Sequence, residues 1–311
     1  MSKRDFLSID DVDPGELVAL LDGADRHKAD RRPRDTLGGR TVALIFEKPS
    51  TRTRVSFEVA VHELGGYPLS LSGAELQLGR GETMEDTAAV LSRYVHAIVL
   101  RTFAQESLER LARGGTVPVV NALSDYAHPC QALADLQTIR ERKGRLQGIR
   151  LGYLGDGNNV AHSLLFAGAK MGMHVAMATP VGYEPIPQVV RRATEIAATT
   201  GGSVELTHDP ATAAKDADVL YTDVWASMGQ ELEHGERALI FKPYQLSTDT
   251  VMAAAPDVMV LHCLPAHRGE EIAAEVMDGP NSAVFDQAEN RLHTQKALLS
   301  WLLTGSAEPS R

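Results

Sequence analysis

Cysteines and long apolar runs are scarce in this 311-residue chain. Its two cysteines, Cys130 and Cys263, form no C-x-x-C pair. We therefore expect neither a disulfide framework nor a structural zinc site, and a reducing compartment fits this composition. No stretch approaches the ~18–20 consecutive apolar residues that cross a bilayer, and the first residues turn acidic at Asp10 without the apolar core of a signal peptide. We expect a cytoplasmic protein with no membrane anchor.

Basic residues are outnumbered by acidic ones. The chain has 31 Lys and Arg against 41 Asp and Glu, a formal net charge of −10. This balance disfavours general nucleic-acid binding, although it is compatible with a small basic pocket for an anionic metabolite. Hydrophobic residues at 43% and charged residues at 23% are values typical of a folded globular protein.

Short apolar runs alternate with helix-type segments along most of the chain. The runs at Thr41–Phe46, 96–101 and 117–122 are nearly continuous, as expected for strands buried in a parallel sheet. A polar segment at 140–150 follows and is a candidate linker, after which the alternation begins again. The pattern predicts an α/β protein of two domains, each a parallel sheet flanked by helices.

Residues suited to an anion follow the first of these runs. Ser50, Thr51, Arg52 and Thr53 come directly after it, at the expected start of a helix. Free N–H groups and the helix dipole favour an anion there, and Arg52 can bind a phosphate through two hydrogen bonds. The alternative is an ordinary helix cap with solvated arginines.

The next two strand ends add further donors. One run ends at Arg101, and the following one leads to His128 and Gln131, on either side of Pro129 at an expected helix start. Each residue alone fits a surface or capping role. Because parallel strands end at one edge of a sheet, the three strand ends together favour an anion site.

The second half contains an incomplete dinucleotide-type loop. Gly155 and Gly157 follow a predicted strand, but Val160 stands where the third glycine of the fingerprint belongs, so a nicotinamide cofactor is disfavoured. Asn159 is placed to bind a polar ligand or to cap the helix.

Two later strand ends carry an acid and a thiol. Asp223 is followed by a loop with Ser227 and Met228, which suits an amino-acid ammonium group, although a surface turn is the alternative. Cys263 and Leu264 follow the last strand, and a lone cysteine there is more often packed than reactive.

Taken together, Ser50 to Arg54, His128 to Gln131, the DVWASMG segment at 223–229 and the HCLP segment at 262–265 resemble the ornithine carbamoyltransferases, within the aspartate/ornithine carbamoyltransferase family. The match extends over nearly the whole chain. The resemblance implies transfer of the carbamoyl group of carbamoyl phosphate to the δ-amine of L-ornithine, giving L-citrulline and phosphate, in arginine biosynthesis rather than catabolism. It implies no metal and no cofactor, and small-molecule substrates rather than a nucleic acid or membrane partner.

The resemblance also implies an organisation and a set of contacts. A carbamoyl-phosphate domain would span 1–143, with a C-terminal helix at 287–311 packing back on it, and an ornithine domain would span 150–286, the two joined by crossing helices. The implied carbamoyl-phosphate contacts are Ser50, Thr51, Arg52, Thr53, Gln77, Arg101, His128, Gln131, Cys263, Leu264 and Arg291. The implied ornithine contacts are Asn159, Asp223, Ser227 and Met228. The catalytic residues would be Arg101, His128 and Cys263, and Gln77 would reach the neighbouring active site in a homotrimer.

Three alternatives remain open from the residues. The same chemistry could use putrescine or an acylated ornithine as acceptor, although Asp223 favours a free α-ammonium. A dehydrogenase would need the missing glycine. A non-catalytic sensor would be expected to have lost Arg52, His128 or Cys263, and all three are present.

Overall fold

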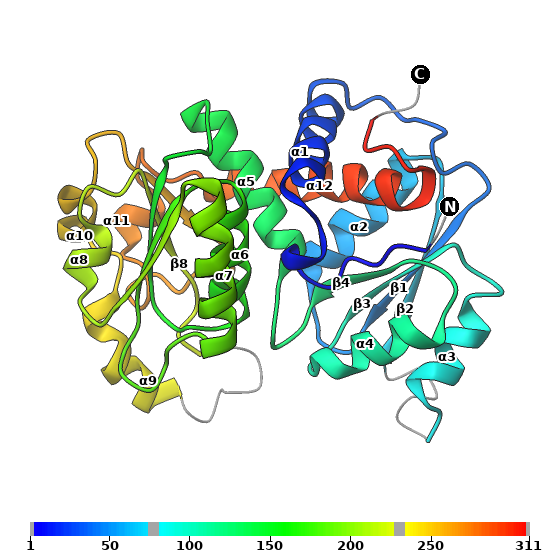
Figure 1. Ribbon diagram of the computed structural model, residues 1–311, viewed down its shortest axis with the longest axis horizontal. Helices are drawn as coiled ribbons and strands as arrows, with labels where there is room; N and C mark the ends of the chain where they lie inside the picture. Colours follow the sequence, from blue (N-terminus) through cyan, green and yellow to red (C-terminus); the bar gives the residue numbers. More distant parts are fainter. Residues whose placement is uncertain (1–2, 74–80, 227–233, 309–311) are drawn as a thin grey trace. The chain divides into compact units, whose positions relative to one another are not determined.

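The chain forms two compact units, shown in Figure 1. The computed structural model describes residues 3–73, 81–226 and 234–308. Unit 1 comprises Met1–Gln137 and Glu289–Arg311, and unit 2 comprises Thr138–Ala288. The divisions fall within the helices α5 (Pro129–Lys143) and α12 (Val284–Thr304), so both helices begin in one unit and end in the other.

Unit 1 contains a four-stranded sheet with the order β2-β1-β3-β4. The pairings β1–β2, β1–β3 and β3–β4 are all parallel. Its strands are β1 (Thr41–Phe46), β2 (Tyr67–Ser72), β3 (Ala97–Arg101) and β4 (Val119–Leu123), and its helices are α1 (Pro14–Ala29), α2 (Thr51–Glu63), α3 (Met84–Leu91) and α4 (Gln105–Gly114). A short 3-10 helix at Ile9–Asp11 precedes α1. Figure 1 shows α3 and α4 on one side of the sheet and α1 and α2 on the other.

Helices on both faces explain the apolar runs of the strands. All residues of β3 are buried, and so are the four central residues of β1. Ile45, Ile98 and Leu100 pack with Leu108 and Leu111 of α4. Because neither face of the sheet meets water, alternation is unnecessary and each strand is apolar throughout.

Unit 2 contains a five-stranded parallel sheet with the order β7-β6-β5-β8-β9. Its strands are β5 (Arg150–Leu154), β6 (His174–Ala178), β7 (Ser203–Thr207), β8 (Val219–Thr222) and β9 (Met259–His262). Its helices are α6 (Asn159–Lys170), α7 (Pro187–Thr200), α8 (Pro210–Ala214), α9 (His234–Phe241), α10 (Thr248–Ala253) and α11 (Ala274–Met277), with a 3-10 helix at Lys242–Tyr244. A core of small and branched side chains, including Ala213 of α8 and Val276 of α11, packs with Leu220 of β8 and Val260 of β9.

In each sheet the strand order reverses once. The reversal lies between β1 and β3 in unit 1 and between β5 and β8 in unit 2. The connections on the two sides of such a point lead away from each other and leave a crevice at the carboxyl ends of the strands. The fold therefore predicts one ligand site in each unit.

The predicted fold class is confirmed, with one strand that the sequence pattern missed. Edge strand β2 reads YPLSLS, and its residues are only partly buried or exposed. Pro68 and the alternating serines give it none of the continuous apolar character of its neighbour β1, because only one of its edges is paired. No helix in the described part of the chain is long and apolar enough to cross a membrane.

One buried group makes the stability of unit 1 depend on pH. His27 of α1 is fully buried. Burial lowers its pKa from 6.5 to about 4, and the nearby cations Lys296 and Arg34, together with His293, add to this effect. Between pH 6.5 and 4 the unfolded chain binds a proton at this position that the folded chain does not. Stability from the neutral imidazole is therefore complete above pH 6.5 and is lost as the pH falls towards 4.

We expect this single group to remove about 3 kcal/mol from the free energy of unfolding between pH 7 and pH 4. His27→Leu replaces the imidazole of α1 with an apolar side chain of similar size that cannot bind a proton. This variant should therefore lose less stability over the same pH range. Urea unfolding of both proteins at pH 7, 5.5 and 4 measures the difference. Equal pH dependence in the two proteins would contradict the role of His27.

Candidate active site

The first strand of unit 1 leads directly into a capped helix. Ser50 is the N-cap of α2, and its hydroxyl accepts a hydrogen bond from the backbone N–H of Thr53 at 3.4 Å. Thr51 and Arg52 are exposed in the first turn, whereas Thr53 is buried. The arrangement presents hydroxyls, N–H groups and a guanidinium at a helix N-terminus, where an anion is stabilised.

A cavity of about 350 Å³ lies beside this helix start. Its lining includes Ser50, Arg54, Lys48 and, from β2, Ser70 and Ser72. The Lys48 ammonium is buried, pairs with Asp125 at 2.5 Å and lies 4.1 Å from the centre of the Phe103 ring. The cavity therefore has a largely polar wall at the carboxyl edge of the sheet, made of hydroxyls, two cations and the acidic residue Glu47.

Arg291 of α12 joins two other predicted site residues, Gln131 and Thr53. Its Nη1 donates to Oε1 of Gln131 at 2.6 Å, and its Nη2 donates to Oγ1 of Thr53 at 3.1 Å. Gln131 in turn donates to Oδ1 of Asp135 at 2.8 Å. Thr53, Gln131 and Arg291 come from α2, α5 and α12, so the structure brings together residues that are far apart in the chain.

Arg101 and His128 are buried in the same unit. Arg101 ends β3 and is paired in register with Phe46, the last residue of β1. The pKa of His128 lies well below its usual value because of burial, and the charges of Arg291 and Arg101 lower it further. His128 is therefore neutral at physiological pH and can donate one N–H to a neighbouring oxygen.

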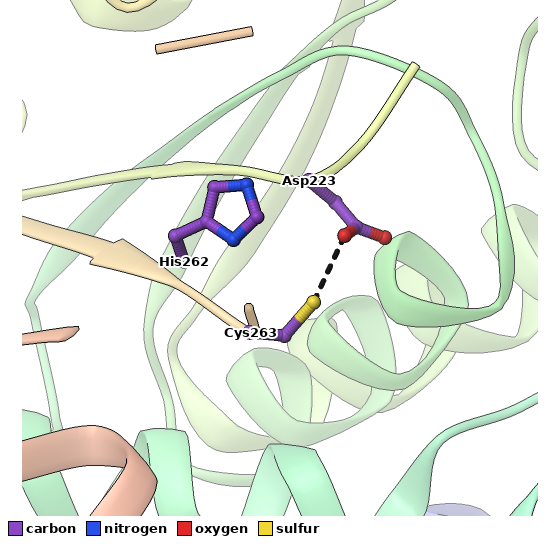
Figure 2. A group of neighbouring side chains, drawn as sticks. All are labelled: Asp223, His262 and Cys263. Atoms are coloured by element: carbon purple, nitrogen blue, oxygen red, sulfur yellow. Dashed lines mark hydrogen bonds between the residues drawn. The ribbon is translucent and has the colours of Figure 1, made fainter. Parts of the chain in front are cut away.

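The second cluster of predicted residues lies in unit 2. Asp223 and Cys263 follow the paired residues Thr222 of β8 and His262 of β9. Figure 2 shows the Cys263 thiol pointing to the Asp223 carboxylate, with a donor–acceptor distance of 2.9 Å between Sγ and Oδ1. Asp223 is buried and Cys263 is partly exposed. Register within the sheet thus places an acid and a thiol side by side.

Asn158, which is not among the predicted site residues, donates a hydrogen bond to the second oxygen of Asp223. Its Nδ2 donates to Asp223 Oδ2 at 2.8 Å, while its Oδ1 caps α6 by accepting the N–H groups of Val160 and Ala161. The capping role considered for Asn159 therefore belongs to Asn158. Asn159 is the first residue of α6 and is partly buried. Two consecutive asparagines in the sequence indicate an N-cap, but the backbone conformation decides which of them is the cap.

Three predicted residues lie outside the described part of the chain: Gln77, Ser227 and Met228. The remaining ones divide between the units. Ser50, Thr51, Arg52, Thr53, Arg101, His128, Gln131 and Arg291 belong to unit 1, and Asn159, Asp223, Cys263 and Leu264 belong to unit 2. All of these contacts with substrates stay predictions.

Two groups of described side chains have the composition of a metal site. Asp223, His262 and Cys263 form one, and His267, Glu270 and Glu271 form the other, with the candidate ligand atoms of each group within 4.8 Å of one another. In the first group the thiol already donates to Asp223. In the second, Glu271 accepts hydrogen bonds from His262 and from the His267 backbone. The expectation of no metal stays a prediction.

Two family models match the chain, one in each half. Residues 4–141 match the family model described as "Aspartate/ornithine carbamoyltransferase, carbamoyl-P binding domain", and residues 147–302 match "Aspartate/ornithine carbamoyltransferase, Asp/Orn binding domain". Together these matches span nearly the whole chain. The protein belongs to the aspartate/ornithine carbamoyltransferase family.

Its relatives within the family carry a more specific name. The chain is 66% identical over 307 residues to an ornithine carbamoyltransferase of Parafrankia sp. (strain EAN1pec), with 97% of each chain covered. It is 56% identical to a protein of Pyrococcus furiosus named "Ornithine carbamoyltransferase, anabolic", with 98% of each covered. The solved structure of the ornithine carbamoyltransferase from Pyrococcus furiosus is similar with a TM-score of 0.94, at 56% identity and 98% coverage of each chain.

Proposed function

We propose that this protein is an ornithine carbamoyltransferase, which converts carbamoyl phosphate and L-ornithine to L-citrulline and phosphate. The observation that carries the proposal is the cluster of Arg101, Arg291 and neutral His128 in unit 1, at the edge where the helix start at Ser50 also lies. Such a cluster suits a dianionic phosphate next to a carbonyl group. The names of the relatives supply the acceptor, L-ornithine.

The reaction needs an anion site and a hydrogen-bond donor for oxygen. The δ-amine attacks the carbonyl carbon, and a C–N bond forms while the carbonyl oxygen becomes an oxyanion. Thr53, Arg101 and His128 donate to this oxygen, a stabilisation worth several kcal/mol. The C–O bond to phosphate then breaks. Ser50, Arg52 and the N–H groups of α2 hold the departing phosphate, which takes the proton released by the amine nitrogen.

Asp223 gives the acceptor its orientation. In the proposed complex its carboxylate pairs with the α-ammonium, and Asn159 and Met228 bind the α-carboxylate, which leaves the δ-amine as nucleophile. An alkyl ammonium with a pKa of ~10.4 must first lose a proton. Cys263, whose thiol faces Asp223, is the proposed helper in that step.

Two rival functions make different demands on these residues. Putrescine has no carboxylate for Asn159 and Met228 to bind, and an acylated ornithine has no α-ammonium for Asp223. A non-catalytic sensor would not need Arg52, His128 and Cys263 together. The relatives' names also favour the enzyme that uses ornithine itself.

We further propose the organisation expected from the sequence. A carbamoyl-phosphate domain would comprise 1–143 with 287–311, and an ornithine domain 150–286; the family match at 4–141 and the grouping of Glu289–Arg311 with Met1–Gln137 support such a division. A homotrimer with Gln77 serving an adjacent active site, and a cytoplasmic location, belong to the same proposal. The word "anabolic" in the name of the Pyrococcus furiosus relative supports a role in arginine biosynthesis.

The function is tested by measuring ureido-product formation from carbamoyl phosphate with four acceptors in parallel. These are L-ornithine, putrescine, N-acetylornithine and L-aspartate, without added metal or nucleotide. We expect turnover with L-ornithine alone. Turnover with a different amine would overturn the acceptor assignment, and no turnover with any of the four would favour the sensor.

Arg52→Ala tests the phosphate site. We expect loss of turnover, and binding of carbamoyl phosphate weakened about 10- to 100-fold because a charged, two-point contact is removed. Binding of norvaline, an ornithine analogue, should change far less. Arg113→Ala is the matched control, since it removes an exposed arginine from α4 of the same unit. Unchanged carbamoyl-phosphate binding in Arg52→Ala would exclude Arg52 from the site.

Asp223→Asn tests the ammonium site. The substitution keeps the size of the side chain but removes its charge, so we expect kcat/KM for ornithine to fall about tenfold or more. The KM for carbamoyl phosphate should change less. Asp249→Asn, the same change at an exposed position of α10, should behave as wild type. Wild-type ornithine kinetics in Asp223→Asn would remove this residue from the mechanism.

A further inference from the structure

A buried histidine lies immediately before the predicted reactive turn. His262 is the last residue of β9, and Cys263 and Leu264 follow it directly. Its backbone N–H donates to Oε1 of Gln287 at 3.0 Å, and its side chain is fully buried. Figure 2 shows the imidazole beside Asp223 and Cys263, but no hydrogen bond joins the ring to either of them.

The imidazole instead spans the turn. Its Nδ1 accepts the backbone N–H of Leu264 at 2.8 Å, so the proton of the neutral ring is on Nε2. Nε2 donates that proton to Oε1 of Glu271 at 3.1 Å. One ring therefore joins the backbone of the turn to a carboxylate nine positions later in the chain.

Glu271 is an anchored anion. Its side chain is fully buried, and its Oε1 also accepts the backbone N–H of His267 at 2.5 Å. Burial raises the pKa of Glu271, but the hydrogen bonds from His262 and the His267 backbone outweigh burial, and the net pKa is lowered. The backbone of Glu271 is held as well, because its carbonyl accepts the N–H of Leu246 at 2.9 Å.

The turn needs such support. Leu264 has a φ of 59°, a left-handed backbone conformation that residues other than glycine rarely adopt. A backbone in this region persists when its surroundings hold it. The N–H bond to His262 restrains the Leu264 backbone, while its side chain packs against the core of unit 2. The thiol of Cys263 meets Asp223 from the same turn.

We propose that His262 and Glu271 are positioning residues, which hold the Cys263–Leu264 turn in the conformation required for catalysis. This inference rests on the proposed carbamoyltransferase function, to which it adds two residues that touch no substrate. Their part is to fix the direction of the Cys263 thiol and of the Leu264 backbone.

Paired substitutions separate the two ends of the imidazole. His262→Asn keeps an acceptor at the position of Nδ1, and His262→Gln keeps a donor at the position of Nε2 but lacks the acceptor for Leu264. Glu271→Gln keeps Oε1 as an acceptor, and Glu271→Leu removes it. We expect the KM for carbamoyl phosphate to rise and kcat to fall, each about tenfold or more, in His262→Gln and Glu271→Leu, the effect of losing a buried hydrogen bond. Glu271→Gln should stay within about threefold of wild type, and His262→Asn, which keeps the bond to Leu264 but loses the one to Glu271, should lie between the two groups.

Thr200→Val is the control for general destabilisation of unit 2. The Thr200 hydroxyl donates to the carbonyl of Ala169 at 2.5 Å, between α7 and α6. This variant should lower the thermal midpoint and leave both KM values unchanged. If His262→Gln and Glu271→Leu behave in the same way, with normal kinetics for the folded protein, the positioning role is wrong. If Glu271→Leu does not fold, the His262 pair decides the question alone.

A second readout does not need activity. Cys130 is buried, so iodoacetamide should alkylate Cys263, and mass spectrometry can follow this modification. We expect alkylation of Cys263 to be faster, about tenfold, in His262→Gln than in His262→Asn, since only the former frees the turn. Equal rates would overturn the inference. Absence of citrulline formation by wild-type protein together with different alkylation rates would instead overturn the proposed function and leave the restraint on the turn standing.

Discussion

Parallel pairing at two places in the fold, β1 with β3 and β5 with β8, is the constraint on which the remaining architecture depends. Parallel strands require long connections, and these lead to opposite sides of the sheet where the strand order reverses. The carboxyl ends at that point stay uncovered by the connections. Polar and charged residues can lie there without interrupting the apolar strands, and residues of both candidate sites follow these strand ends.

The candidate sites of the two units bury charges of opposite sign. Unit 1 buries Arg101 and Arg291 with a histidine whose protonation they disfavour, so the cluster has donors and positive charge but only a neutral imidazole. Unit 2 buries Asp223 and satisfies its oxygens with Asn158, the Val224 N–H and the Cys263 thiol. Buried charge is costly unless hydrogen bonds or a ligand offset the cost. A dianion in the first unit and an ammonium in the second would meet complementary charge.

The turn after β9 illustrates how rigid elements determine the direction of reactive groups. β9 is buried and paired with β8, so the position of His262 is set by the sheet. Through its bond to the Leu264 N–H, the imidazole also fixes the backbone two residues beyond the strand. Glu271 accepts a hydrogen bond from the other nitrogen of the ring. Precise placement of a site generally requires such support from residues behind it.

Much of this organisation could be predicted from the sequence, because the apolar strand runs and the residues that follow them are local features. Thr41–Phe46 is a strand as expected, and the candidate site residues lie at the ends of expected strands or the starts of expected helices: Ser50, Arg101, His128, Asp223 and Cys263. Edge strand β2 was not predicted, because a partly exposed strand that contains a proline has no distinctive sequence pattern. The two units divide inside α5, and a continuous helix carries no local pattern that marks where its contacts change from one unit to the other.

The sequence by itself therefore determined the α/β class, the strand ends that carry the candidate site residues and the family resemblance. Only the tertiary structure decided which residues meet: Arg291 with Thr53 and Gln131, Asn158 with Asp223, and His262 with Glu271. The physical reason is that hydrogen bonds between distant side chains depend on sheet register and helix packing. Those are properties of the whole fold, and no stretch of residues encodes them alone.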